Sequence, residues 1–343
     1  MKKGMVILMS LSLVIAQAGE IRWRDLPPLP RALGGQFVGV IGNRLVVAGG
    51  SHWDGVPRPW DGGRKLWSDA IYTLERGTSH WVRSGSLPVP LGYGATASTG
   101  DAMLCIGGQT PSENARKAFR LQWSGNAVAV EEMPGLPSAA SNTACAIDDS
   151  MVYVVAGQAT PASLVALGSF QVFSIAHPEG GWRTLPAYPG PRRILPMAAA
   201  GGGAFYLIGG AELTGMAGPP VSRRFLKDVY RYRARNGWDR LPDLPSASSA
   251  GYAVMEGEDL LVMGGNDGEY ADREFEIKDN HPGFPLHVYR LKPGAKSWES
   301  FGRLPSSLVT SGLVRWGKEI VIAGGEDRPG HRSARVIAGK IVK

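Results

Sequence analysis

Two residues of opposite charge near the end of the chain, Glu326 and Arg332, are spaced so that they could act together. They stand on either side of a turn that contains Pro329 and Gly330. Arg332 could bind a substrate carboxylate through two parallel hydrogen bonds. Glu326 could transfer a proton if burial favours its protonated form. The spacing therefore suggests an acid/base pair, and a surface salt bridge that fixes the turn is the alternative.

A second candidate segment runs from Ser51 to Lys65 and is rich in aromatic and charged residues, with Trp53 and Trp60 among them. Aromatic faces beside charged groups are typical of sugar-binding sites, so we expect His52 and Trp53 to line a pocket. The alternative is a loop that folds on itself around its tryptophans.

A third segment, Asn266 to Pro285, begins with polar and acidic residues. It lacks the alternating ligands and the glutamate at the twelfth position that a calcium loop needs. We expect Asn266 and Asp267 to line the pocket, and metal binding is the alternative for this segment. The six histidines show no metal-ligand spacing, and the diglycines precede no helix that could hold a nucleotide phosphate. We expect neither a metal nor a cofactor.

These segments follow a repeat in which a short apolar strand ends in two glycines. The pairs begin at Gly49, Gly107, Gly209, Gly264 and Gly324, with a degraded copy at Ala156-Gly157, and recur every 49 to 60 residues. An aromatic strand and a Leu-Pro pair follow most copies. A period near fifty with this pattern is typical of kelch repeats, each of which forms one four-stranded blade. The sequence therefore predicts an all-β fold, a six-bladed kelch-type β-propeller over residues 19–343.

The two ends of the chain complement each other. Residues 21–27 have the pattern of an outermost strand, whereas the last repeat has three strands and no outermost one. The N-terminal strand is therefore predicted to complete the last blade, which removes a free sheet edge. Because strand direction alternates within a blade, the loops after the diglycines and the linkers between blades share one face.

Residues 1–18 resemble a secretory signal, with Lys2 and Lys3 before an apolar run and a small-x-small cleavage site ending at Ala18. A short membrane anchor is the alternative. We expect cleavage, a periplasmic or secreted protein, and no membrane association afterwards. Export would permit a disulfide, but Cys105 and Cys145 lie within apolar strands of adjacent blades, which favours two core thiols.

The formal net charge is +7 and would fall by two with the loss of the signal. The basic residues are scattered rather than clustered, which argues against nucleic acid as a partner. A mildly basic ring suits a small anionic ligand. The sequence leaves open whether the protein forms a homodimer.

The loop segments resemble those of the bacterial N-acetylneuraminate epimerases (sialic acid mutarotases), with the blades in circularly permuted order. The likeness lies in Gly325-Glu326 followed by Pro329-Gly330 and Arg332, in the long loop that follows Gly49-Gly50, and in the linker Pro189-Gly190-Pro191-Arg192. It implies that Glu326 and Arg332 are catalytic and that Arg192 binds substrate. The Asn266–Pro285 insertion is shorter than the one in that family.

The resemblance implies an exported isomerase that needs no cofactor. Such an enzyme would interconvert the α and β anomers of N-acetylneuraminate or a related acidic sugar by acid/base ring opening. The alternative function is a non-catalytic propeller that binds a glycan or a protein, because fold alone does not fix function. A copper-radical oxidase is disfavoured because both cysteines lie inside strands.

Overall fold

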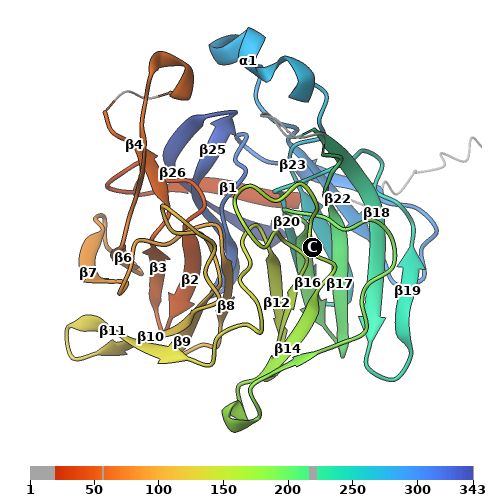
Figure 1. Ribbon diagram of the computed structural model, residues 1–343, viewed down its shortest axis with the longest axis horizontal. Helices are drawn as coiled ribbons and strands as arrows, with labels where there is room; N and C mark the ends of the chain where they lie inside the picture. The colour runs from red at the N-terminus through yellow and green to blue at the C-terminus, as the bar shows by residue number, and fades with distance from the viewer. Residues whose placement is uncertain (1–19, 56–57, 216–221, 343) are drawn as a thin grey trace, which may run out of the picture.

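The computed structural model describes residues 20–55, 58–215 and 222–342, and the predicted signal, residues 1–18, lies outside the described residues. Within the described part, the strands form six four-stranded antiparallel sheets arranged as blades around an axis, together with one two-stranded ribbon (Figure 1). The predicted six-bladed propeller is confirmed.

Within each blade the strands follow one another outward from the axis in chain order, except that β1 completes blade 6. Blade 1 contains β2 (Phe37–Ile41), β3 (Arg44–Ala48), β6 (Ala70–Glu75) and β7 (Val82–Ser86), and blade 2 contains β8 (Ala95–Ser98), β9 (Ala102–Ile106), β10 (Ala118–Ser124) and β11 (Ala127–Met133). Blade 3 contains β12 (Ala144–Asp148), β13 (Met151–Val155), β14 (Phe170–Ser174) and β15 (Trp182–Thr184), and blade 4 contains β16 (Met197–Gly201), β17 (Ala204–Leu213), β18 (Arg223–Arg233) and β19 (Gly237–Leu241).

Blade 5 contains β20 (Tyr252–Glu256), β21 (Asp259–Met263), β22 (His287–Leu291) and β23 (Glu299–Arg303), and blade 6 contains β24 (Leu313–Trp316), β25 (Glu319–Arg328), β26 (His331–Val342) and β1 (Glu20–Leu26). The ribbon pairs β4 (Ser51–Trp53) with β5 (Lys65–Trp67). Short helices lie in the loops: η1 (Pro59–Asp61), η2 (Pro178–Gly180), η3 (Ala271–Arg273), α1 (Glu274–Ile277) and η4 (Lys278–Asn280). Among the described residues, none of the helices has the length and apolarity that a membrane span requires.

The N-terminal strand closes the ring as predicted. β1 pairs antiparallel with β26 along its whole length, from Glu20 opposite Val342 to Leu26 opposite Val336. The outermost strand of the last blade thus comes from the other end of the chain. This pairing covers the backbone edge that β26 would otherwise expose.

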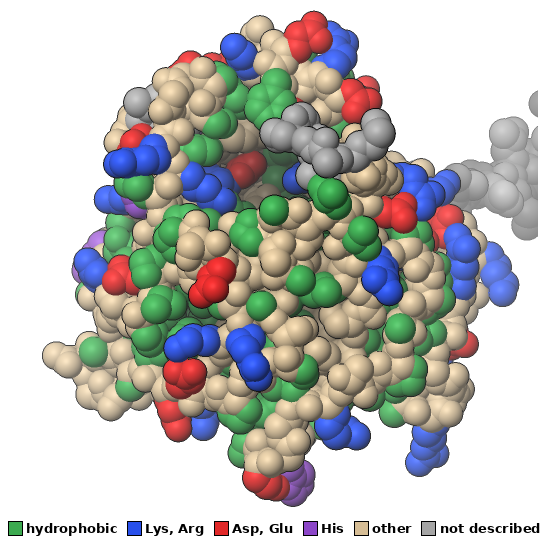
Figure 2. All heavy atoms as spheres, viewed as in Figure 1, with side chains coloured by type: hydrophobic (Ala, Val, Ile, Leu, Met, Phe, Trp, Pro, Cys, Tyr) green, Lys and Arg blue, Asp and Glu red, His purple; other side chains and the backbone are tan. Residues whose placement is uncertain are grey.

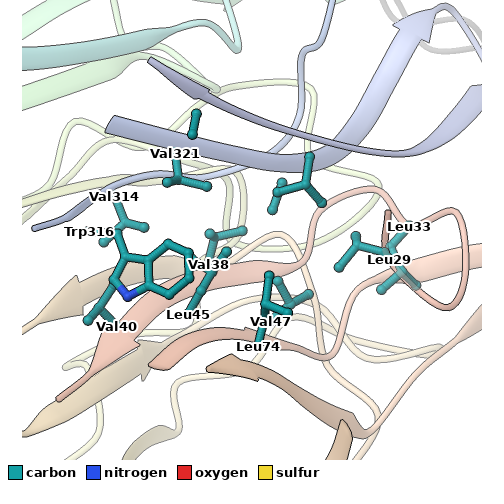
Figure 3. Packing of buried hydrophobic residues seen from close by; sticks show 13 residues of the cluster. Leu29, Leu33, Val38, Val40, Leu45, Val47, Leu74, Val314, Trp316 and Val321 are labelled. Carbon is teal, nitrogen blue, oxygen red and sulfur yellow. The ribbon is translucent and has the colours of Figure 1, made fainter. Parts of the chain in front are cut away.

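Each seam between neighbouring blades holds its own buried apolar cluster, because a blade buries its two faces only against other blades. Figure 3 shows the seam between blades 6 and 1, where Val314, Trp316 and Val321 face Val38 and Leu45. The tryptophans at the outer strands pack against these clusters as well. Their indole N–H groups donate to proline carbonyls of the preceding linker, in the pairs Trp81–Pro27, Trp182–Pro134, Trp238–Pro186 and Trp298–Pro242.

The diglycines mark the points where a strand end touches the linker into the next blade. Gly49 has a φ of 64°, and a Cβ there would lie 2.1 Å from the Leu91 carbonyl oxygen. The Gly50 N–H donates to that same oxygen at 2.8 Å. Blade 3 has Ala156 at the first position, with a φ of 62°. Backbone geometry therefore favours glycine at these strand ends, and blade 3 shows that alanine can occupy the first of the two positions.

A closed ring of six backbone hydrogen bonds surrounds the axis on the face that carries these linkers. Each blade contributes one residue just before its innermost strand, and each N–H donates to the carbonyl of the corresponding residue in the preceding blade at 2.6–3.2 Å. The members of this axial ring are Gly35, Tyr93, Asn142, Leu195, Ala250 and Thr310, all with φ between 50° and 68°. They line a narrow cavity of about 90 Å³ on the axis.

The two cysteines are free thiols. Cys105 is fully buried in the seam between blades 1 and 2, as expected. Cys145 packs against the cluster between blades 2 and 3, also as expected, but it is only partly buried because it lines the axial channel, the cavity between the inner strands. The innermost strand β12 borders that channel, so a residue of this strand can face it.

Candidate active site

Three segments project from one face of the ring and contact one another. They are the arm that carries β4 and β5 (residues 51–67), the hairpin tip between β25 and β26 (residues 325–333) and the blade 5 insertion that carries α1 (residues 266–285) (Figure 1). We call these three segments the crown. Trp53 Nε1 donates to the Gly330 carbonyl at 2.8 Å, and Arg328 Nη1 donates to the Asp279 carbonyl at 3.0 Å. Arg58 also forms a close ion pair with Asp279.

Glu326 and Arg332 face each other across the sixth-blade hairpin. The expected loop is instead a continuation of the strands, since β25 runs to Arg328 and β26 begins at His331. Glu326 and Arg332 are register partners in this pair, and their side chains form a close ion pair. Their side chains are 17% and 6% exposed, respectively, so this is not the fully solvated surface salt bridge of the alternative interpretation.

The Arg332 guanidinium makes further contacts with other blades. Its Nη2 donates to the Tyr93 hydroxyl at 2.7 Å and to Ser51 Oγ at 3.3 Å. Its Cζ lies 5.6 Å from the centroid of a Trp53 ring, a cation–π distance. A Cβ on Gly34 would lie 2.2 Å from Arg332 Nη1, so the glycine leaves the space that the guanidinium occupies. Arg332 is thus fixed by blades 1, 2 and 6 together.

A cavity of about 470 Å³ opens beside Arg332. Its lining includes Arg31, His52, Trp53, Asp54, Leu66, His331 and Arg332. Figure 2 shows the molecule hollowed below the projecting arms, with acidic and basic side chains in and around the hollow. Pockets of about 300–1,000 Å³ are the usual size for small ligands. The volume suits a monosaccharide, and the polar lining suits an anionic one.

His52 connects the first arm to Arg31. Its Nδ1 lies 2.9 Å from the Trp53 carbonyl oxygen, which can only accept a hydrogen bond. Arg31 Nη1 lies 2.8 Å from Nε2 and 3.1 Å from Nδ1 of the same ring. These contacts hold the Arg31 guanidinium beside the cavity that both residues line. No carboxylate of the described residues lies within ion-pair distance of Arg31.

Tyr93 is a site residue that sequence reasoning missed. Burial of the phenol alone would raise its pKa, but the charges of Arg332 and Lys65, with hydrogen bonds to Ser51 and Lys65, lower the pKa of Tyr93 to about 8. From the sequence, Tyr93 was expected only as part of the inner strand of blade 2 (residues 92–98), whereas β8 begins at Ala95. Its role follows from contacts with Lys65 and Arg332, which are 28 and 239 positions away in the sequence. No local sequence pattern reveals such contacts.

The structure brings some of the predicted site residues together and leaves others apart. Glu326, Arg332, His52 and Trp53 lie at the cavity or are paired to a residue that lines it. Three predicted substrate ligands do not line it: Arg192, Asn266 and Asp267.

Each of those three has a local explanation. Arg192 is exposed on the linker before blade 4. The side-chain oxygens of Asn266 and Asp267 accept backbone N–H groups two residues on, at 2.9 and 3.1 Å, so they shape the turn. Among residues 20–55, 58–215 and 222–342, no group of three His, Cys, Asp or Glu side chains could hold a metal ion.

The tryptophans of the first arm match neither sequence interpretation fully. Trp53 and Trp60 are partly buried, but they pack against the neighbouring hairpin rather than within their own loop, both at Gly330. Trp53 nevertheless lines the cavity. This arm therefore contributes one aromatic side chain to the wall of the cavity.

The chain is similar to curated proteins named N-acetylneuraminate epimerase, which confirms the resemblance found in the sequence. It is 26% identical to the one from Haemophilus influenzae over 204 residues, which cover 51% of this chain and 53% of that protein. It is 33% identical to the one from Brucella suis over 136 residues (35% and 34%) and 30% identical to the one from Vibrio cholerae over 125 residues (32% of each). The chain spans about half or less of the length of these relatives.

A solved structure described as "Structure of YjhT" superimposes with a TM-score of 0.67 at 13% identity, covering 93% of this chain and 99% of that one. At this identity the likeness concerns the fold. No family model matches the chain.

Proposed function

We propose that the protein is a cofactor-independent mutarotase that interconverts the α and β anomers of N-acetylneuraminate or a closely related acidic sugar. The observation that carries the proposal is the Glu326–Arg332 pair, largely buried beside a monosaccharide-sized cavity with a second guanidinium at its rim. The name shared by the curated relatives supports the sugar. Export through residues 1–18 is part of the same proposal.

The reaction needs proton transfer and no redox change. The anomeric hydroxyl loses its proton, the bond between the anomeric carbon and the ring oxygen breaks, and the ring oxygen gains a proton. The open keto form then closes on its other face by the reverse steps. We assign proton transfer at the anomeric oxygen to Glu326, whose carboxylate can accept and return the proton. Acid/base assistance of this kind contributes about 10²–10⁴-fold.

Arg31 and Arg332 supply the positive charge that would hold the sugar carboxylate. Both line the cavity, and each has a planar guanidinium suited to bidentate contact with a carboxylate. Trp53 would pack against the C–H face of the ring. These roles place the carboxylate at the rim of the cavity and the anomeric carbon towards the Glu326–Arg332 pair.

The test is NMR observation of freshly released α-anomer with wild-type protein and with Glu326→Gln. We expect the protein-dependent rate of equilibration to fall by about 10²–10⁴-fold in the variant. Glu212→Gln is the matched control, because Glu212 and Arg224 form the same kind of cross-strand pair on the blade 4 hairpin. It should leave the rate unchanged.

Equal rates for wild type and Glu326→Gln would reject the role of Glu326. Binding of N-acetylneuraminate without any acceleration of anomer exchange would favour the non-catalytic glycan-binding alternative instead. The two results are separable because the first concerns one residue and the second the whole activity.

A further inference from the structure

Tyr93 occupies a place where the backbone of the ring and the candidate site meet. It is the blade 2 member of the axial ring, with a φ of 58°. Its N–H donates to the Gly35 carbonyl at 2.6 Å, and its own carbonyl accepts the Asn142 N–H at 2.7 Å. The backbone of Tyr93 is thus fixed by blades 1 and 3, which determines where its side chain begins.

The side chain of Tyr93 is held just as closely. Its hydroxyl lies 2.7 Å from Arg332 Nη2 and 2.9 Å from Ser51 Oγ. The rings of Tyr93 and Trp67 pack in a T-shaped arrangement, with 5.5 Å between their centroids. Lys65 Nζ lies 4.2 Å from the centroid of the Tyr93 ring. Packing and hydrogen bonds from β4, β5 and β26 therefore leave the hydroxyl one position, against the guanidinium.

We propose that Tyr93 is a positioning residue of this site: its hydroxyl fixes the Arg332 guanidinium at the cavity, and ionisation of that hydroxyl places a negative charge beside the Glu326–Arg332 pair, where an anionic sugar would meet it. This inference rests on the proposed function for the identity of the sugar. The placement of the hydroxyl against Arg332 does not depend on it.

The charged groups around Tyr93 determine the sign of the effect. The β25–β26 hairpin contributes Arg332 and, through it, Glu326; β5 contributes Lys65; and the contacts from β4 and the blade 1 linker, Ser51 and Gly35, are neutral. Because these cations lower the pKa of Tyr93 to about 8, the phenolate forms as the pH rises through that value. The added negative charge then opposes binding of a carboxylate.

The experiment compares wild type with Tyr93→Phe, which removes the hydroxyl and keeps the ring. The first readout is phenolate absorbance against pH, which requires no substrate. The second is KM and kcat for anomer exchange of N-acetylneuraminate from pH 6 to pH 10. Tyr188→Phe is the matched control, because the Tyr188 hydroxyl donates to the Leu167 carbonyl and not to a site residue.

We expect one phenolate to titrate near pH 8 in wild type and in Tyr188→Phe, and to be missing in Tyr93→Phe. We also expect KM in wild type to rise on the order of tenfold above that pH, by repulsion between the phenolate and the substrate carboxylate. In Tyr93→Phe, KM should be raised at neutral pH, because Arg332 has lost a fixed partner, and it should no longer depend on pH near 8.

Absence of an early phenolate from wild type, or an alkaline rise in KM that persists in Tyr93→Phe, would overturn the inference. A phenolate that titrates near pH 8 in a wild-type protein without anomer exchange would support the placement of Tyr93 and reject the proposed function. Failure of the inference about Tyr93 can therefore be distinguished from failure of the proposed mutarotase function.

Discussion

At the scale of single residues, the surroundings of a guanidinium decide what it can still bind. Arg193 is fully buried and makes two hydrogen bonds of 2.7 Å to Asp228, so it is a structural residue. Arg332 already pairs with Glu326. Arg31 contacts the ring of His52 and lines the cavity. Of these three, Arg31 has the charge most available to a ligand.

Replacement of Arg31 by alanine should therefore weaken binding of an acidic sugar more than it slows the chemistry. A hydrogen bond to a charged group contributes about 1.5–3 kcal/mol, so we expect KM for N-acetylneuraminate to rise about tenfold to a hundredfold with kcat little changed. Steady-state kinetics of anomer exchange would measure both constants.

Arg192→Ala is the matched control for that variant. Arg192 is exposed on a linker of the same face and does not line the cavity, so its loss should leave both constants near the wild-type values. A larger effect on KM from Arg192→Ala than from Arg31→Ala would contradict the assignment of Arg31 and restore the prediction made from the linker sequence.

At the scale of elements, the sequence predicts what depends on neighbours along the chain. The six-blade repeat, the diglycine ends and the closing strand β1 were all predictable, because strand periodicity and turn residues are local signals. The crown was not. The contacts Trp53–Gly330 and Arg58–Asp279 join segments more than two hundred residues apart, and side chains that meet in this way leave no common pattern in either segment.

The site residues also divide into those that a local sequence pattern predicts and those that it does not. Glu326 and Arg332 could be found because one hairpin carries both. Tyr93 and Arg31 could not, because each reaches the site from another linker. Arg192 was predicted from the resemblance of its linker to the mutarotase family, although the arginine that is buried on this linker is Arg193.

The diglycines allow a prediction about an element rather than about the site. Gly49→Ala would place a Cβ 2.1 Å from the Leu91 carbonyl oxygen, in a left-handed conformation with a φ of 64°. The left-handed backbone costs about 1–2 kcal/mol and overpacking typically adds about 1–3 kcal/mol. We expect the free energy of unfolding to fall by roughly 3 kcal/mol, measured by denaturant titration.

Gly42→Ala separates the two causes. Gly42 has almost the same φ, 60°, but no atom lies within 4 Å of the position that a Cβ would take there. Its substitution should cost only about 1 kcal/mol, the backbone strain less the entropy that alanine removes from the unfolded chain. If Gly49→Ala and Gly42→Ala lower the unfolding free energy equally, the contact with the Leu91 carbonyl does not contribute to the requirement for glycine at position 49.

At the scale of the whole molecule, three features close one circle. The pairing of β1 with β26 joins the ends of the chain, the apolar seams join each blade to the next, and the axial ring links all six inner linkers by backbone hydrogen bonds. The candidate site depends on this closure, since Arg332 contacts Tyr93 and Ser51 from different blades. A substitution that destabilises the closing strand β1 should therefore lower the stability of all six blades together.

Ile21 on β1 tests that dependence. Its side chain is 7% exposed and packs in the cluster between blades 5 and 6. Ile21→Ala should lower the unfolding free energy by about 2–5 kcal/mol, the usual range for such a core truncation. If the ring unfolds as one unit, the transitions followed by tryptophan fluorescence and by far-ultraviolet circular dichroism will shift to the same lower denaturant midpoint.

Arg22→Ala, at an exposed position next to Ile21 on the same strand, is the control. It should change the unfolding free energy by only about 0.5 kcal/mol or less. Two separated transitions in Ile21→Ala, one early and one at the wild-type midpoint, would instead mean that blades 5 and 6 open alone while the rest of the propeller stays folded.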